Sequence, residues 1–127
     1  MTIQQLVNQL DEIEVVLKEQ VDHFDPESVL SKGNKLTTIL PNCNNVCSEL
    51  EKTVNILTWD FIKQEGLNVK GAHTELVREA MIDEHLSDIK AQLRRAEGYS
   101  KAIYATLEWL RSNISYLKGE QKQLGVN

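Results

Sequence analysis

Apolar side chains recur at alternating steps of four and three residues along the last third of the chain. This seam consists of Ile82, Leu86, Ile89, Leu93, Ala96, Ser100, Ile103, Leu107, Leu110, Ile114, Leu117, Gln121 and Leu124. Its spacing is that of a heptad repeat and predicts an amphipathic helix of about six heptads, with Ser100 and Gln121 as polar interruptions. Such a helix is roughly 60 Å long at 1.5 Å per residue, which exceeds what a compact domain of this size needs. The seam therefore either packs against its own chain or pairs with another chain.

The N-terminal part of the chain shows two further helical patterns. Apolar residues at heptad-like steps predict a first helix from Ile3 to Phe24. A new helix is expected at Asp25, which suits an N-cap, followed by Pro26 at the first helical position. Pro41 is predicted to end this second helix, because proline removes an N–H donor and clashes with the preceding turn.

A middle helix is predicted from about Asn45 to Glu65, with Gly66 as its C-terminal cap. The connection at 67–72 is short, so the next helix should be an antiparallel neighbour. Together these signals predict a single helical domain over residues 1–127. Its parts are N-terminal helices within 1–40, a middle helix within 42–66 and a long helix over 73–120.

Gly98 interrupts the seam but leaves its heptad phase unchanged on both sides. We interpret it as a bend or a point of close approach within one helix; a turn at residues 98–100 would instead give a compact bundle. The predicted fold class is all-α, an antiparallel helical hairpin or bundle with a long C-terminal amphipathic helix that self-associates into a homo-oligomer.

Composition narrows the classes of protein to consider. The chain is 41% hydrophobic and 6% aromatic, and no apolar stretch approaches the ~20 residues that span a bilayer. The N-terminus lacks the basic and then apolar layout of a signal peptide. We therefore expect a cytoplasmic protein without a membrane partner, in which Cys43 and Cys47 are reduced thiols.

Charge is distributed unevenly along the chain. Residues 1–89 hold 7 Lys/Arg and 16 Asp/Glu, for a net charge of −9, whereas residues 90–127 hold 7 and 3, for +4. Such asymmetry suggests an electrostatic partner, either another copy of the chain or an anion, although ordinary surface variation can also produce it.

Catalytic and metal-binding patterns are weak. Cys43 and Cys47 could share one helix face, but zinc needs four ligands and the histidines are scattered, so buried or turn cysteines are the better interpretation. The Glu-x-x-His pairs of di-iron bundles are missing. The acids Glu49, Glu51, Glu75, Glu79 and Asp83 only loosely imitate the magnesium site of helical nucleotide pyrophosphohydrolases. We therefore predict a non-enzymatic protein without a cofactor.

The basic C-terminal segment is the stronger functional signal. Lys90, Arg94 and Lys101 share one helix face, with Arg95 adjacent. Aromatic residues lie in the same segment or on the preceding helix, namely Trp59, Tyr99, Trp109 and Tyr116. Cations for phosphates and rings for bases are what single-stranded nucleic acid requires, whereas a solvated helix face is the alternative.

The order of features over residues 46–120 resembles the UvsY-type recombination mediators of phages. The similarity lies in Leu50-Glu51, in the run from Trp59 to Gly66, in the run from Asp83 to Ile89, and in Tyr99, Leu107, Leu110 and Ile114. It implies a small helical oligomer, located in the host cytoplasm, that binds single-stranded DNA and helps to load a RecA-like recombinase onto strands coated by single-strand-binding protein. It also implies that Lys63, Lys90, Arg94, Arg95 and Lys101 contact phosphates.

Three functions follow as hypotheses. The leading one is a recombination mediator whose partners are single-stranded DNA and a recombinase or single-strand-binding protein. The second is a helical interaction or inhibitor module whose acidic half docks a basic partner. The third is a metal-dependent nucleotide pyrophosphohydrolase.

Overall fold

The computed structural model describes residues 1–67 and 74–123, and these residues form helices, turns and loops with no strand among them. The helices are α1 (Ile3–Lys18), α2 (Pro26–Gln64), α3 (Glu75–His85) and α4 (Ser87–Gln123). The predicted all-α fold class is confirmed.

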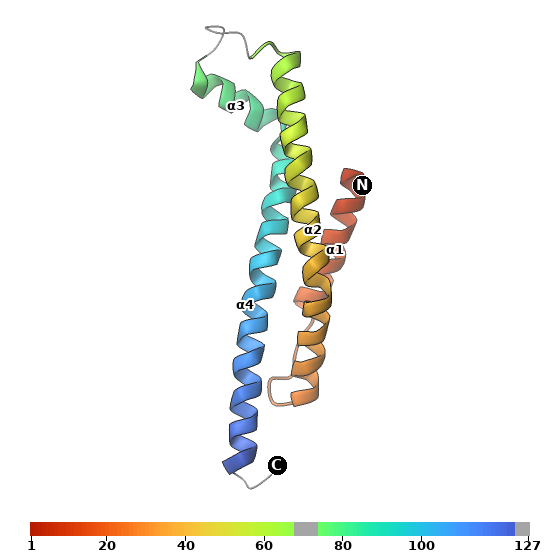
Figure 1. The fold of residues 1–127 in the computed structure, drawn as a ribbon, viewed down its shortest axis with the longest axis vertical. Coiled ribbons are helices and arrows are strands. Elements are labelled where there is room, and N and C mark those ends of the chain that lie inside the picture. Colours follow the sequence, from red (N-terminus) through yellow and green to blue (C-terminus); the bar gives the residue numbers. More distant parts are fainter. Residues whose placement is uncertain (68–73, 124–127) are drawn as a thin grey trace.

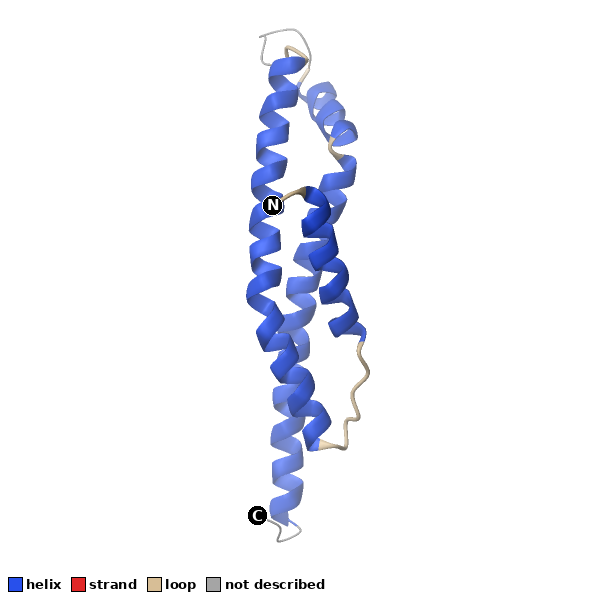
Figure 2. Ribbon diagram, turned by 90° about the vertical axis from the view of Figure 1, so that its right-hand side faces the viewer, coloured by secondary structure: helices blue, strands red, loops and turns tan. Residues whose placement is uncertain are grey.

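The two long helices α2 and α4 pack antiparallel and form an elongated hairpin (Figure 1). α1 lies along the middle of this hairpin as a third helix and contacts both long helices (Figures 1 and 2). The short α3 lies at an angle near the end where α2 stops (Figure 1). The bundle is therefore three helices thick only where α1 is present, and elsewhere α2 and α4 pack mainly as a pair.

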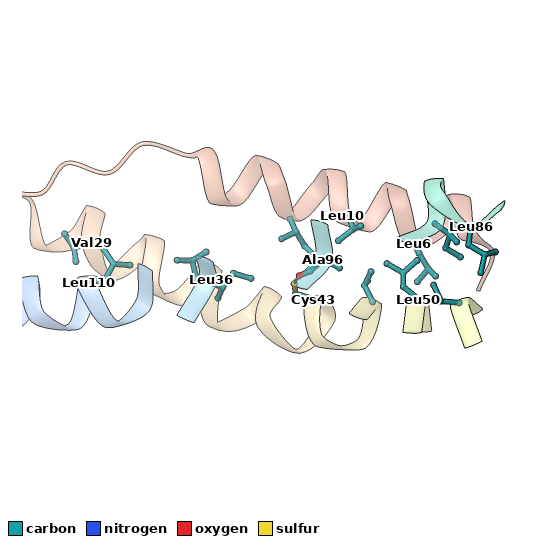
Figure 3. Packing of buried hydrophobic residues seen from close by; sticks show 14 residues of the cluster. Leu6, Leu10, Val29, Leu36, Cys43, Leu50, Leu86, Ala96 and Leu110 are labelled. Carbon is teal, nitrogen blue, oxygen red and sulfur yellow. Dashed lines mark hydrogen bonds between the residues drawn. The ribbon is translucent and has the colours of Figure 1, made fainter. Parts of the chain in front are cut away.

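Much of the seam of α4 packs against the rest of its own chain, which is the first of the two possibilities that its length left open. The buried cluster draws on α1, α2 and α4, and its principal members are Leu6, Leu10, Ile13, Val29, Leu36, Cys43, Val46, Leu50, Ile89, Ala96, Ile103 and Leu110. Figure 3 shows Val29 and Leu110 at one end of this cluster, Cys43 with Ala96 farther along, and Leu6, Leu50 and Leu86 at the other end. Burying one leucine completely contributes about 1.5–3 kcal/mol, so this shared interior holds the three helices together.

The prediction of one helix over 73–120 is wrong at Leu86. α3 ends at His85, and Leu86 has φ −104° and ψ 14°, outside the helical range. Hydrogen bonding continues on both sides, because the Leu86 N–H donates to Ile82 and the Leu86 carbonyl accepts from Lys90. Leu86 itself is buried, so the heptad spacing continues through a kink that the spacing does not reveal.

The predicted stop at Pro41 is also wrong, because α2 is continuous from Pro26 to Gln64 with Pro41 inside it. Pro41 and Thr37 are both exposed, so water can hydrate the Thr37 carbonyl that loses its N–H partner. On the opposite side of the helix, buried Leu36 and Cys43 anchor the backbone before and after the proline. Packing on one side thus outweighs one missing hydrogen bond on the other.

The two ends of α2 follow their capping chemistry. Asp25 accepts a hydrogen bond from the Glu27 N–H, as expected for the N-cap of α2. Gly66 has φ 66°, and the bonds from Gly66 to the Lys63 carbonyl and from Leu67 to the Ile62 carbonyl form a Schellman motif. The predicted cap at Gly66 is confirmed, whereas the first helix ends at Lys18 and not at Phe24.

Gly98 lies within a continuous α4, so the prediction that it does not form a turn is confirmed. A Cβ at this position would meet no atom of the described residues within 4 Å, so Gly98 is not a point of close approach. The six residues at 68–73, which include most of the predicted connection, and the seam residue Leu124 lie outside the described part of the chain.

Candidate nucleic-acid interface

The structure does not gather the five predicted phosphate-contacting cations on one surface. Lys63 lies two residues, or about 200°, round α2 from the buried Phe61. Arg94 lies two residues before the buried Ala96 on α4. Because the buried sides of α2 and α4 face each other, Lys63 and Arg94 point away from the bundle in opposite directions.

Arg95 is committed to a contact inside the protein. One guanidinium nitrogen, Nη2, donates to Asp11 Oδ1 and to Glu14 Oε2, both at 2.7 Å, and Nε donates to Tyr99 Oη at 2.9 Å. The guanidinium also lies 5.2 Å from the centre of the Tyr99 ring. Asp11 and Glu14 belong to α1, so Arg95 fastens α1 to α4 and is not available to a phosphate while α1 is docked.

These ion pairs perturb the groups that form them. The pKa of Glu14 is lowered to about 2, mainly by the hydrogen bond from Lys18 and next by the one from Arg95. The contact with Asp11, and then that with Tyr99, raise the pKa of Arg95 above its ordinary value. Glu14 is therefore ionised at any physiological pH, and the contact between α1 and α4 is between full charges.

Lys90 is also paired, although less completely. Its Nζ lies 2.5 Å from Asp83 Oδ1, a contact that crosses from α4 to α3 past the kink at Leu86. Its side chain is 26% exposed, whereas that of Asp83 is 68% exposed. Lys90 therefore supports the position of α3, and its charge is partly neutralised.

Arg94 and Lys101 are exposed, and neither forms an ion pair with any residue that the structure describes. They are seven residues apart, so they lie on the same side of α4 about 10 Å apart along the axis. Tyr104 is 55% exposed and follows Lys101 by three residues, which places it about 60° away round the helix. We call the surface formed by Arg94, Lys101 and Tyr104 the outer side of α4. The exposed Glu97 and Glu108 lie beside these residues and reduce the positive charge of this surface.

Trp59 provides a second exposed ring, at 63% exposure, four residues before Lys63 on α2. The pair could stack a base and contact a phosphate, but it lies on the opposite surface from Arg94 and Lys101. The Trp109 ring meets His23 edge-on at 4.9 Å between centres and is 46% exposed. Of the predicted cations and rings, the structure thus gathers Arg94 and Lys101 on one accessible side of α4.

The sequence pattern missed Lys32, which is 5% exposed and lies among the apolar positions of α2. Its ammonium donates to the carbonyls of Val16, Leu17 and Glu19, which end α1. Burial, the largest cause, lowers the pKa of Lys32. Its position between Val29 and Leu36 on the buried side of α2 is the one signal in the sequence that could have revealed it.

The two cysteines lie in the interior as predicted. Cys43 is fully buried, its thiol donates to the Ala96 carbonyl at 3.6 Å, and burial raises its pKa to about 11. Cys47 is partly buried. In the described ranges 1–67 and 74–123, no three His, Cys, Asp or Glu side chains gather so as to hold a metal ion. Over the same ranges, no helix is both long and apolar enough to cross a membrane.

No protein-family model, curated protein or solved structure matches the chain. Any function assigned to the chain therefore depends on its residues and their geometry.

Proposed function

We propose that this protein is a non-enzymatic accessory protein that binds single-stranded DNA along the outer side of α4 and assists a RecA-like recombinase. The observation that carries the proposal is that Arg94 and Lys101 are exposed, aligned and free of ion pairs among the described residues, with the Tyr104 ring beside them. Cations that already had acidic partners would have to give them up on binding a phosphate, whereas these two would not.

The physical basis is the release of counterions and the stacking of bases. Each phosphate that a lysine or arginine neutralises releases condensed counterions, so affinity should fall as salt rises. An exposed tyrosine ring offers a stacking surface to an unpaired base, which duplex DNA does not present. These contacts favour single-stranded over double-stranded nucleic acid.

Two cations make a weak site, so the proposal includes self-association. If several copies align their α4 helices, each added site binds the same strand at a high effective concentration. Overall affinity can then exceed that of one site by about 10²–10⁴. A homo-oligomer would thus explain how a chain with a net charge of −5 could hold an anionic strand.

The mediator role rests on the resemblance of residues 46–120 to UvsY-type proteins. This stretch covers the second half of α2, all of α3 and most of α4, and so includes Arg94 and Lys101. Under this proposal the recombinase or the single-strand-binding protein is a second partner that contacts another part of the surface.

The test is the binding of a fluorescent oligothymidylate, followed by anisotropy at several salt concentrations. The protein should bind at low salt, and its affinity should fall as salt rises. Replacing Arg94 and Lys101 with glutamine should reduce the slope of log affinity against log salt by about 0.7 for each phosphate that is no longer neutralised. Replacing both with glutamate should abolish binding.

The controls are chosen from the ion pairs. Arg95 is left unchanged, because its substitution would loosen α1 as well as remove a charge. Lys52→Glu is the matched surface control, since Lys52 is exposed on α2 and its contact with Glu49 is long, at 3.7 Å. Lys52→Glu and the glutamine variant of Arg94 and Lys101 both lower the net charge by two, so equal losses in these two would show only an effect of net charge. An unchanged signal at low salt would refute DNA binding.

A protein-interaction module is the second candidate, and α3 favours it. None of the α3 residues is buried, and Leu76 is 78% and Val77 48% exposed beside the acids Glu75 and Glu79. An exposed apolar pair with acidic neighbours suits a basic protein partner. Failure of the oligonucleotide to bind would make this candidate the leading one.

A further inference from the structure

Beyond the C-terminal end of α1, a groove runs between the first turns of α2 and the last described turns of α4. Its volume is about 540 Å³, and a second hollow of about 190 Å³ continues it and shares Leu30, Ile114 and Lys118 with it. It lies on the face of the hairpin opposite α1, because the connection between α1 and α2 passes on the α1 side, where Asn113 Nδ2 donates to the His23 carbonyl and the Trp109 ring meets that of His23. The pair α2 and α4 therefore presents an uncovered groove there.

The floor of the groove is apolar. Leu30 from α2 and Leu107, Leu110 and Ile114 from α4 line it, and Leu30 is 49% exposed. Gly33 lines the groove as well, and because glycine has no side chain, it leaves space between α2 and α4. About half of the Leu30 side chain is in contact with water. An apolar side chain docked in the groove would remove this surface from water, which is favourable.

The rim of the groove on α4 is cationic. Arg111 and Lys118 both line the groove, both are exposed, and neither pairs with an acid whose side chain the structure describes, that is, within residues 1–67 and 74–119. They are seven residues apart and so lie on the same side of the helix. The occupant of this groove therefore needs apolar groups for the floor and negative charges for one edge.

The hairpin already binds a helix of this kind elsewhere. α1 packs Leu6, Leu10 and Ile13 into the hairpin and places Asp11 and Glu14 on Arg95. Arg95, which contacts α1, precedes the buried Ala96 by one residue, whereas Arg111, which lines the groove, follows the buried Leu110 by one. Successive residues are about 100° apart round a helix, so α1 and the groove lie on opposite sides of the row of buried residues on α4. The same two long helices thus offer a second face with the same combination of apolar floor and flanking cation.

We propose that this groove docks an amphipathic helix of a partner protein, with its apolar stripe on Leu30, Leu107 and Ile114 and its acidic side chains on Arg111 and Lys118. A nucleic-acid strand fits less well, because its phosphates would lie over leucine side chains. The inference goes beyond the proposed function: Arg111 lies one heptad after Tyr104, but Arg111 and Lys118 line the groove, whereas Arg94, Lys101 and Tyr104, which are assigned to DNA, do not.

The test uses the full chain and a fluorescent peptide with the sequence of residues 2–19, which is α1 with its N-cap. This probe has the required chemistry, an apolar stripe flanked by Asp11, Glu12 and Glu14. In the control peptide Asp11 is replaced by asparagine, and Glu12 and Glu14 by glutamine; Lys18 and Glu19, whose charges cancel, are kept. Saturable binding of the acidic peptide, and binding of the neutral one that is about tenfold weaker, are expected.

Variants of the protein locate the peptide. Arg111→Glu with Lys118→Glu should weaken binding about tenfold, and Leu30→Ser should weaken it without changing any charge. The matched control is Arg94→Glu with Lys101→Glu, which reverses two cations of the same helix outside the groove and should leave the peptide affinity unchanged. All these residues are exposed, and unchanged far-UV circular dichroism verifies folding.

Three results would overturn the inference. The first is that the acidic peptide does not bind at low salt. The second is that binding depends on Arg95 and not on Arg111 and Lys118, which would mean that the peptide displaces α1. The third is that the Arg111/Lys118 variant loses oligonucleotide binding while peptide affinity stays the same, which would assign the rim to nucleic acid. Loss of DNA binding in the Arg94/Lys101 variant alone concerns the proposed function and not this groove.

Discussion

Replacing Lys32 with methionine should loosen α1 from the bundle. Methionine keeps the unbranched apolar stem of the side chain but removes the ammonium that donates to the carbonyls of Val16, Leu17 and Glu19. The last carbonyls of a helix have no partner within the helix, and a cation near them also interacts favourably with the helix dipole. The substitution therefore removes the cationic partner of the last carbonyls of α1 with little change in packing volume, while the Glu19 N–H still donates to the Val16 carbonyl.

The expected loss is smaller than a sum over three bonds. A hydrogen bond to a charged group contributes about 1.5–3 kcal/mol, but burial of the ammonium lowers the pKa of Lys32 and so opposes the charged form. Water can also reach the exposed residues around Glu19 and replace part of the cap. We therefore expect a decrease in the free energy of unfolding of about 2 kcal/mol. For a chain of this length this corresponds to a drop in Tm of roughly 8 °C.

Lys35→Met is the matched control. Lys35 lies three residues later on α2 and contacts Glu19 Oε1 at 2.7 Å, but both side chains of that pair are nearly half exposed. An exposed ion pair contributes about 0–1 kcal/mol, so this variant should unfold close to the parent protein. The measurement is urea and thermal unfolding followed by circular dichroism. Amide hydrogen exchange should show that α1 loses protection first in Lys32→Met.

A capping role for Lys32 is refuted if Lys32→Met is as stable as the parent protein, or if Lys35→Met loses as much stability. Equal acceleration of exchange in α1 and in α4 would refute it too, because the cap acts on α1 alone.

Two further predictions concern ionisation and glycine. Because the pKa of Glu14 is lowered from 4.5 to about 2 in the folded chain, its contribution to stability is complete above pH 4.5 and is lost as the pH falls towards 2. Unfolding measured across that range should show a flatter pH dependence in Glu14→Gln, and an identical dependence would contradict the assignment. Gly33→Ala should raise stability by about 0.5–1 kcal/mol, since the new Cβ would lie 3.9 Å from Leu110 Cδ1, an ordinary contact. Gly66→Ala should lower stability by about 1 kcal/mol, because φ is 66° there, and equal effects of the two substitutions in urea unfolding would refute the distinction.

Features that depend on a few neighbouring residues were predictable. The Asp25 cap and Pro26 start α2, and Gly66 ends it, because each of these signals acts within one helical turn. The heptad positions of α4 likewise identify the side that becomes buried. The errors at Pro41 and Leu86 have a common origin. A rule based on one proline, or on the heptad spacing alone, does not take into account the tertiary packing that supports the backbone around that residue.

The candidate interface was only partly predictable, because the sequence shows where cations are but not which acids they meet. Arg94 and Arg95 are adjacent and chemically identical, yet Arg94 faces solvent while Arg95 pairs with Asp11 and Glu14 more than eighty residues earlier. Lys32 is a charged residue on an apolar side, and its role becomes apparent only once the end of α1 lies against it.

By itself the sequence determined that the chain is helical, where the capped ends of α2 lie and which side of each long helix is apolar, since helical periodicity and capping are local. Only the tertiary structure decided that the seam packs against α2 and α1 of the same chain, which cations remain unpaired, and that the face of the hairpin opposite α1 carries an uncovered groove. The physical reason is that these outcomes depend on contacts between residues far apart in sequence, whose free energy is realised only when the helices pack together.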